Sequence, residues 1–433
     1  MPEPVHPAPI SREIWEQKYR LKDPDGRPRD KTLGDTFERV ARAVASVERG
    51  GRKVRDAWAA QYSEAMGAYE FLPAGRILAG AGADRAVTLF NCFVLGAIPD
   101  DLGGIFDAVK DAALTMQAGG GIGHDFSTLR PKGALVRSIG ADASGPVSFM
   151  DVWDAMCRTI MSAGARRGAM MATLRCDHPD IEAFIAAKSD PQRLRNFNMS
   201  VLVSDAFMRA VADGQPWNLV FGGEVVRTVD ARALWDRLMR ATYDYAEPGV
   251  VFIDRINARN NLAYCELIHA TNPCGEQPLP PYGACLLGSI NLARLIVSPF
   301  EPSARLDTAR LEDRVRLAVR FLDAAIDVSK YPLAAQRHEA RAKRRIGLGV
   351  TGLADALIYC GVRYGSAEAV ATAEDWMRRI QNAAYAASAE LAEEKGAFPL
   401  YERDAILSSP NVAALDEPVQ AVVARCGLRN GCL

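Results

Sequence analysis

The feature that most constrains the fold is an alternation of short apolar segments with helical segments through the middle of the chain. Parallel strands need long crossover connections, usually a helix, so this alternation predicts parallel pairing and an α/β barrel or doubly wound sheet. The predicted strands are 172–175, 197–203 and 250–253, and the predicted helices are 179–188, 205–212 and 230–245.

Helices are predicted on both sides of this region. Leu33, Phe37 and Val40 begin a helical apolar stripe near the N-terminus, and Gly50-Gly51 separates it from a second helix that runs to residue 69. The other predicted helices are 105–117, 313–329, 352–360 and 367–395. We therefore divide the chain into an N-terminal helical segment, residues 1–70, and an α/β domain, residues 71–433.

Charge and composition exclude several classes of function. The 52 basic and 53 acidic residues leave a net charge of −1, so nucleic acid is not an expected partner. Neither a secretion leader nor a run of ~18 apolar residues is present, which predicts a cytoplasmic chain without a membrane span. The nine cysteines are expected to be reduced thiols, and the five histidines show no metal-binding spacing, so no metal site is predicted.

A loop at residues 272–285 concentrates reactive side chains on a backbone rich in proline and glycine. Its sequence, NPCGEQPLPPYGAC, excludes a helix or a central strand because proline lacks a backbone donor and restricts φ. Asn272, Cys274 and Glu276 are spaced i, i+2 and i+4, so an extended backbone would point all three to one side. The loop is therefore expected to present an amide, a thiol and a carboxylate to one small substrate.

The chemistry of this loop has several interpretations. A thiol can act as a nucleophile, a metal ligand, a redox group or a radical carrier, and a neighbouring carboxylate can accept a proton. Cys285 is too far along the chain from Cys274 for a C-x-x-C redox pair and does not match a zinc-binding pair. An ordered proline-rich turn with chance cysteines is the alternative without a function.

Cys92 lies in a second apolar segment, residues 88–95 (TLFNCFVL), which predicts a buried strand. Alternation places Cys92 and Val94 on one face of the strand and Asn91 on the other. On residue type alone, Cys92 is most simply a core residue.

Three further segments have features of ligand sites. The glycines of 119–123 permit close backbone approach to a ligand, although the ending of a phosphate-binding P-loop is absent. Ser144-Gly145-Pro146 begins a helix whose free N-terminal amides favour an anion. Residues 163–172 (AGARRGAMMA) form a loop with Arg166 and Arg167, which on its own is most simply a solvated connector.

The run of NPCGE, a proline-rich step, a second cysteine and LGSINL at residues 272–292 resembles the active-site loop of ribonucleotide reductases. The short spacing to the second cysteine is most similar to the adenosylcobalamin-dependent class. The resemblance implies that Cys274 carries a thiyl radical that removes the 3′ hydrogen of the ribose. It implies that Glu276 is the base on the 3′ hydroxyl and that Asn272 binds the sugar hydroxyls.

Further roles are implied by the same resemblance. Cys92 and Cys285 would supply two electrons and become a disulfide as the 2′ hydroxyl leaves as water. Substrate contacts would come from Asn91, Ser144, Gly145, Asn272 and Glu276. A deoxynucleoside triphosphate or ATP would bind as allosteric effector at Asp100, Gly121, Arg130, Arg166 and Arg167.

The family fold is a ten-stranded α/β barrel with the active-site loop at its centre, so residues 71–433 are expected to form a catalytic barrel of this type. The implied cofactor is adenosylcobalamin, the implied substrate is a ribonucleotide, and the implied reductant is a thioredoxin-type or other dithiol. A homodimer is also implied.

The sequence stops at RNGCL (429–433), where family members continue into a phosphate-binding turn, more strands and a cysteine pair. The barrel is therefore expected to be incomplete and the 433 residues alone inactive, as in a truncated enzyme or one with a complementary C-terminal chain. Two alternatives stay open. One is the large subunit of a class that takes its radical from a separate di-metal protein, which a cobalamin requirement would exclude. The other is a non-catalytic nucleotide-binding remnant.

Overall fold

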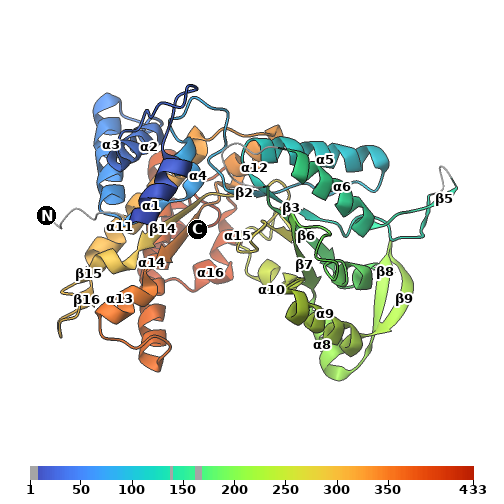
Figure 1. Ribbon diagram of the computed structural model, residues 1–433. Coiled ribbons are helices and arrows are strands. Elements are labelled where there is room, and N and C mark those ends of the chain that lie inside the picture. The colour runs from blue at the N-terminus through green and yellow to red at the C-terminus, as the bar shows by residue number, and fades with distance from the viewer. Residues whose placement is uncertain (1–7, 137–139, 161–167) are drawn as a thin grey trace. The chain divides into compact units, whose positions relative to one another are not determined.

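The computed structural model describes residues 8–136, 140–160 and 168–433, and the chain forms two compact units (Figure 1). Unit 1 combines Met1–Asn91 with Cys285–Leu433, and unit 2 is the continuous segment Cys92–Ala284. Among the described residues, no helix is both long enough and apolar enough to cross a membrane.

Unit 2 is built on a sheet whose strands follow the order β10-β7-β6-β3-β2-β13, with β13 (Ala284–Cys285) at its edge. The first five strands pair in parallel. They are β2 (Cys92–Val94), β3 (Gly121–Asp125), β6 (Met170–Arg175), β7 (Phe197–Val203) and β10 (Gly249–Phe252). Strands that follow one another in this list are neighbours, whereas a doubly wound sheet reverses its order at a switch point. The prediction of an α/β fold with parallel strands is confirmed. The strand order is the singly wound order found in the walls of α/β barrels. The described residues form no closed barrel.

Helices connect these strands as the alternation predicts. Figure 1 shows α5 and α6 side by side along the sheet. The connecting elements are α5 (Leu102–Gln117), β4 (Leu135–Val136), β5 (Ala141–Asp142), α6 (Pro146–Thr159), α7 (Ile181–Ile185), α8 (Asp205–Asp213), β8 (Pro216–Phe221), β9 (Glu224–Asp230), α9 (Ala231–Tyr245) and α10 (Ile253–Ala258).

Side-chain caps fix where the predicted helices begin. Asp101 accepts a hydrogen bond from the Gly104 amide at 2.9 Å, so α5 begins earlier than the predicted residue 105. Ser204 caps α8 as predicted, by accepting from the Phe207 amide at 3.1 Å. α7 is shorter than its predicted range of 179–188.

Unit 1 contains a smaller sheet in which β14 pairs antiparallel with β1 and parallel with β17. Its N-terminal elements are α1 (Pro9–Ile14), the π-helical turn η1 (Trp15–Tyr19), α2 (Leu33–Ala45), α3 (Arg52–Gly67), β1 (Phe71–Pro73) and α4 (Gly75–Gly80). Those after unit 2 are β14 (Leu287–Asn291), the 3-10 helix η2 (Leu292–Leu295), β15 (Ile296–Val297), β16 (Arg305–Leu306), α11 (Thr308–Val328), α12 (Ala334–Lys343), β17 (Gly347–Thr351), α13 (Leu353–Tyr359), α14 (Ala367–Lys395), α15 (Arg403–Leu407), α16 (Pro410–Ala413) and α17 (Glu417–Cys426).

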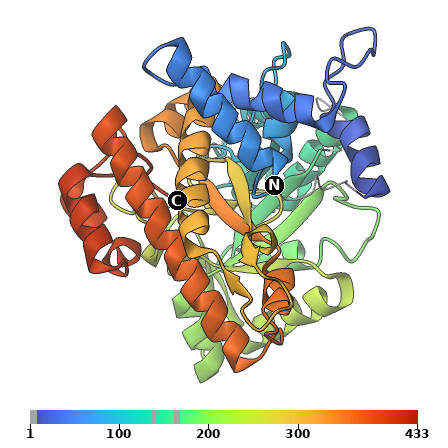
Figure 2. The same ribbon diagram turned by 90° about the vertical axis from the view of Figure 1, so that its left-hand side faces the viewer.

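The centre of unit 1 is α11, which packs against α14 and α2 (Figure 2). The ring of Phe321 on α11 meets those of Tyr62 and Phe71 edge-on at 5.1 Å, and all three rings are fully buried. The helices predicted at 313–329 and 367–395 are confirmed, since they correspond to α11 and α14.

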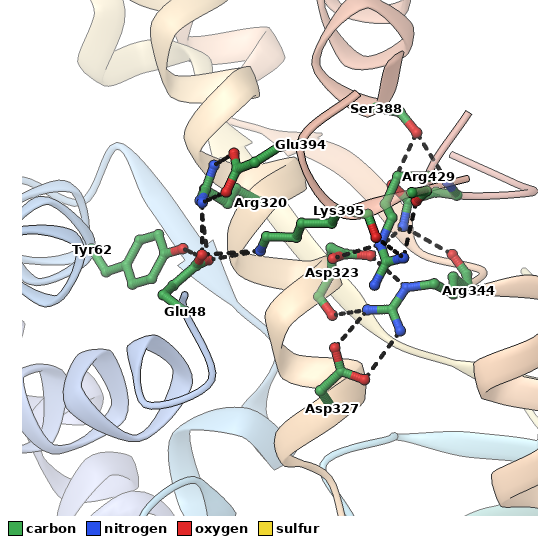
Figure 3. A network of polar contacts seen from close by, with 12 residues as sticks. Glu48, Tyr62, Arg320, Asp323, Asp327, Arg344, Ser388, Glu394, Lys395 and Arg429 are labelled. Carbon is green, nitrogen blue, oxygen red and sulfur yellow. Dashed lines mark hydrogen bonds and ion pairs between the residues drawn. The ribbon is translucent and has the colours of Figure 1, made fainter. Parts of the chain in front are cut away.

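A group of buried charges links α11 to the segment after α2 and to the end of α14 (Figure 3). The Glu48 side chain is fully buried, and Arg320 donates to it from Nε at 3.0 Å and from Nη2 at 2.7 Å. Lys395 Nζ lies 3.0 Å from the same carboxylate. Glu394 accepts one hydrogen bond from each terminal nitrogen of Arg320, both at 2.7 Å. These bonds to Arg320 lower the pKa of Glu394. Each buried charge therefore has a partner of opposite sign.

A second buried group surrounds Asp323, one turn further along α11. Arg344 donates from Nε to Asp323 at 2.8 Å and from Nη2 to Asp327 at 2.9 Å. Burial opposes ionisation of Asp327, but the bonds from Arg344 outweigh it and lower the pKa. Asn430 donates to Asp323 at 3.1 Å and bonds to Ser388 of α14 through its backbone amide at 3.0 Å. The residues near the end of the chain are thereby fixed to α11 and α14.

We predict that Glu48→Gln lowers the free energy of unfolding by about 3 kcal/mol, because it removes the buried carboxylate that neutralises Lys395 and one of the two carboxylates that neutralise Arg320. Urea denaturation measures the effect. Glu38→Gln is the matched control, since Glu38 pairs with Arg42 on the exposed surface of α2, where solvent screens the pair, and is expected to leave the free energy of unfolding nearly unchanged. Equal stability losses in the two variants would contradict the prediction.

Candidate active site

The NPCGE loop connects two short antiparallel strands of unit 2, β11 (Ala270–Thr271) and β12 (Pro278–Leu279). Gly275 has φ +83°, the Gly275 amide donates to the Asn272 carbonyl at 3.0 Å, and the Asn272 amide donates to the Gln277 carbonyl at 3.2 Å. The extended backbone expected here is therefore wrong. Glycine permits the left-handed conformation, and the chain folds back on itself between Asn272 and Gln277.

The three reactive side chains of the turn differ in how far they are buried. Asn272 is completely buried, and its Oδ1 accepts from the Gln277 amide at 3.0 Å. Its Nδ2 is also buried but has no hydrogen-bond partner among the described residues. Cys274 and Glu276 are exposed. The loop thus combines an accessible thiol and carboxylate with a fixed, buried amide whose donor has no hydrogen-bond partner among the described residues.

Two glycines of β3 allow the loop to lie against the sheet. A Cβ at Gly123 would overlap the Thr271 carbonyl oxygen, and one at Gly121 would lie 2.9 Å from Pro273 Cγ. Asn198 of β7 donates from Nδ2 to the Pro273 carbonyl at 2.6 Å. Because Gly121 and Gly123 have no side chains, the loop can lie close to β3, and the hydrogen bond from Asn198 holds it there.

Cys92 faces the same side of the sheet as the loop. Its Sγ lies 3.2 Å from the Cβ position of Gly121, next to Pro273, and the residue is only 2% exposed. Val94 clusters with Ala270 and Leu279 of the β11–β12 hairpin. Cys92 and Val94 thus share the face toward the loop, as predicted, although β2 covers only Cys92–Val94 and not the predicted residues 88–95. The backbone of Cys285 belongs to β13 (Ala284–Cys285), but its side chain lies outside the described residues, so the Cys92–Cys285 pairing stays a prediction.

The other predicted substrate residues lie at the start of α6 and before β2. Gly145 is the N-cap of α6 with φ +79°, and a Cβ there would lie 2.9 Å from the Lys132 amide, so the position requires glycine. Ser144 is exposed, and its carbonyl accepts from Ser148 Oγ at 2.9 Å. Asn91 precedes β2, and its buried Oδ1 has no hydrogen-bond partner among the described residues.

Two of the predicted effector residues contact each other directly. Arg130 Nε donates to Asp100 Oδ2 at 2.9 Å, and the Arg130 amide donates to Asp100 Oδ1 at 3.0 Å. The pair is partly exposed, with each side chain 31% accessible. Gly121 belongs to β3 under the loop, whereas Arg166 and Arg167 lie outside the described residues.

Asn198 is a site residue that the sequence reasoning missed. The only signal was a polar residue that interrupts the apolar strand FNMSVLV, and strand register decides what it meets. No group of three or more metal-ligating side chains occurs among the residues described by the structure.

The fold and the loop define an α/β protein that holds a thiol-bearing turn against a parallel sheet. Residues 90–419 match the family described as "Ribonucleotide reductase, barrel domain", and residues 6–86 match "Ribonucleotide reductase, all-alpha domain". The chain belongs to the ribonucleotide reductase family.

Curated relatives agree with this assignment. A protein of Mycobacterium tuberculosis (strain CDC 1551 / Oshkosh) named "Vitamin B12-dependent ribonucleoside-diphosphate reductase" is 45% identical over 394 residues, which cover 90% of this chain and 56% of the relative. A protein of the same name from Thermoplasma acidophilum is 40% identical over 344 residues, covering 79% of this chain and 44% of the relative. The "Ribonucleoside-diphosphate reductase subunit alpha" of Chlamydia pneumoniae is 27% identical over 381 residues, which cover 79% of this chain and 36% of the relative. The chain spans about half the length of the curated relatives it matches first.

We predict that Gly123→Ala displaces the loop from the sheet, because the added methyl group collides with the Thr271 carbonyl. The expected cost is about 1–3 kcal/mol of unfolding free energy, with faster hydrogen exchange at residues 270–279. Gly349→Ala in β17 is the control, since its Cβ would lie 3.8 Å from the nearest atom outside its own neighbours. Unchanged exchange at the loop in Gly123→Ala would refute the role given to this glycine.

Proposed function

We propose that the protein of which these residues form part reduces ribonucleotides to 2′-deoxyribonucleotides for DNA synthesis by a thiyl-radical mechanism. The observation that carries the proposal is the geometry of the loop in a chain of this family. An exposed Cys274 and Glu276 lie on a turn fixed by a buried Asn272, and the turn lies beside Cys92. A site that only binds nucleotides does not need two thiols, a carboxylate and a free amide together.

Each residue has a defined part in this reaction. Cys274 exchanges a hydrogen atom with the 3′ carbon of the ribose, Glu276 takes the proton of the 3′ hydroxyl, and Asn272 donates from Nδ2 to a sugar hydroxyl. Two thiols, Cys92 and Cys285, give up two electrons and two protons and become a disulfide. The products are the 2′-deoxynucleotide and water, so atoms and electrons balance. A thioredoxin-type or other dithiol then reduces the disulfide.

The cofactor we propose is adenosylcobalamin, as the names of the first relatives indicate for those proteins. The exposure of Cys274 fits this group, because a thiol that receives a radical from a bound cofactor has to be accessible. When bound, adenosylcobalamin supplies that radical. A class I large subunit is the weaker alternative, since the relative named subunit alpha is 27% identical and the B12-dependent relatives are 45% and 40% identical.

Regulation and assembly are also proposed. The partly exposed Asp100–Arg130 pair and the residues near it would receive the effector, a deoxynucleoside triphosphate or ATP. α5 exposes Leu102, Phe106 and Leu114, which are 65%, 50% and 43% accessible and share one side of the helix. A second copy of the chain would cover this apolar side in a homodimer.

The first experiment assays deoxynucleotide formation by the native protein that contains these residues, with adenosylcobalamin, a dithiol and either ribonucleoside diphosphates or triphosphates. We predict that Cys274→Ser lowers turnover by more than about a thousand-fold, because serine does not form the corresponding radical or hydrogen donor. Cys265→Ser, at another exposed cysteine of unit 2, is the matched control and should retain full turnover. Undiminished activity in Cys274→Ser would refute the mechanism, and cobalamin-independent activity would refute the cofactor.

We predict that Phe106→Glu shifts the protein from dimer to monomer in sedimentation velocity, because it places a charge in the apolar contact. Tyr243→Glu on α9 is the control, since Tyr243 is 83% exposed but lies outside α5. If both variants sediment like the parent protein, the dimer contact lies elsewhere or is absent.

A further inference from the structure

The effector segment, residues 128–132, carries Arg130 and is attached to its surroundings by two sets of contacts. The first set joins it to the loop before α5. Thr128 Oγ1 donates to the Ile98 carbonyl at 2.8 Å. Arg130 Nη2 donates to the Asp100 carbonyl at 2.9 Å, in addition to the two hydrogen bonds already described for this pair. These contacts fix the direction of the Arg130 side chain.

The second set of contacts attaches the segment to the turn that precedes α7. His178 Nε2 lies 2.9 Å from the Leu129 carbonyl, and the Lys132 amide donates to Asp180 Oδ2 at 2.9 Å. A Cβ at Gly145 would lie 2.5 Å from the same carboxylate oxygen, so the start of α6 rests against it. His178 and Asp180 therefore lie where the effector segment meets the start of α6.

The hydrogen bonds of the His178 ring determine which of its nitrogens carries the proton. The Asp180 amide donates to Nδ1 at 3.0 Å, so Nδ1 has no hydrogen of its own. Nε2 therefore carries the hydrogen and donates it to the Leu129 carbonyl. His178 is completely buried, so both bonds are needed to satisfy its ring. Only the neutral ring fits this geometry, because an imidazolium would turn a second donor toward the Asp180 amide.

The surroundings of the ring favour the same neutral state. Burial lowers the pKa of His178, and the positive charge of Arg175 acts in the same direction. The hydrogen bond to the carbonyl and the carboxylates of Asp180 and Asp177 oppose this effect without outweighing it. From β8, the Phe221 ring packs edge-on against the imidazole at 5.9 Å and brings no charge. At neutral pH the ring therefore keeps its hydrogen bonds to both segments.

We propose that His178 is a positioning residue of the effector site, where its ring holds residues 128–132 so that Arg130 can contact the phosphates of a nucleotide. Arg130 follows Leu129 directly, so the hydrogen bond to the Leu129 carbonyl fixes the peptide unit from which the guanidinium extends. Arginine binds phosphate through N–H groups in a fixed geometry, and this contact weakens when the backbone that carries it shifts. The inference rests on the proposed function, which places the effector at the Asp100–Arg130 pair.

Two substitutions test the two ring nitrogens separately. Glutamine extends about as far as Nε2 of the imidazole, so His178→Gln keeps a donor for the Leu129 carbonyl. Asparagine extends only as far as Nδ1, so His178→Asn keeps an acceptor for the Asp180 amide and loses the bond to Leu129. Calorimetric titrations of the native protein that contains these residues use dATP, dTTP and ATP, each alone. We expect His178→Asn to weaken binding about ten-fold and His178→Gln to stay within about three-fold of the parent.

Hydrogen exchange measured by mass spectrometry reports on the effector segment without any ligand. Peptides that cover residues 126–134 should exchange about ten-fold faster in His178→Asn than in the parent or in His178→Gln. In the parent, protection corrected for intrinsic exchange should fall as the pH is lowered from about 7.5 to 5.5. The reason is that the opened segment takes up a proton near the ordinary histidine pKa of 6.5, whereas the buried ring does not. His178→Asn should lose this pH dependence.

His338→Asn is the matched control, because it changes an exposed histidine of α12 in unit 1 and should alter neither nucleotide binding nor exchange of the effector segment. Peptides from β6 and β7 report whether each variant is folded. If His178→Asn does not fold, the pH profile of the parent and the affinity of His178→Gln decide the matter.

Unchanged exchange and affinity in a folded His178→Asn variant, or equal losses in His178→Asn and His178→Gln, would overturn the role given to His178. The proposed effector site fails in a different way. If the parent binds none of the three nucleotides although exchange follows the expected pattern, the effector site is refuted, and the attachment of residues 128–132 by His178 stands.

Discussion

The site depends on a steric constraint at β3, where two residues on the loop side of the strand have no side chain. Any larger residue at Gly123 would collide with the backbone of β11, and one at Gly121 would press on Pro273 and Cys92. Because the glycines let the backbone of the hairpin touch the backbone of the sheet, the position of the turn is set by main-chain atoms. A turn held in this way has little freedom to shift, which suits a thiol that must meet one particular atom of a small substrate.

The loop joins two requirements that usually oppose each other. A reactive thiol has to be accessible, and accessible segments are usually mobile. Here Cys274 lies on the exposed side of a short turn whose base is buried, with Asn272 bonded to Gln277 and Asn198 bonded to the Pro273 carbonyl. The anchoring therefore comes from residues on either side of the thiol. The buried Nδ2 of Asn272 has no hydrogen-bond partner in the part of the chain that the structure describes, an arrangement that is costly in a folded protein unless a ligand completes it.

The sequence was sufficient for the parts of the structure that depend on local pattern. Strand–helix alternation predicted the parallel sheet, and apolar spacing predicted α11 and α14 because these signals arise within one element. The turn at Gly275 departs from the extended chain that the residue spacing predicts, because one left-handed glycine reverses the direction of the backbone. Contacts such as Asn198 with Pro273 join residues far apart in sequence and depend on strand register, which no local pattern specifies. The roles of the site residues came from family resemblance and not from periodicity.

The buried carboxylate of Glu48 has a consequence for how the chain is made. Its partners Arg320 and Lys395 follow it by 272 and 347 positions, so its charge is neutralised only after these later segments have been synthesised. Until then the N-terminal helical hairpin has to keep this carboxylate hydrated and cannot adopt its final packing. Unit 2 is a continuous segment that holds the five parallel strands β2, β3, β6, β7 and β10, so pairing of these strands does not depend on the segments that carry Arg320 and Lys395. The residues around Glu48 thus reach their native environment only after the segments that follow them along the chain.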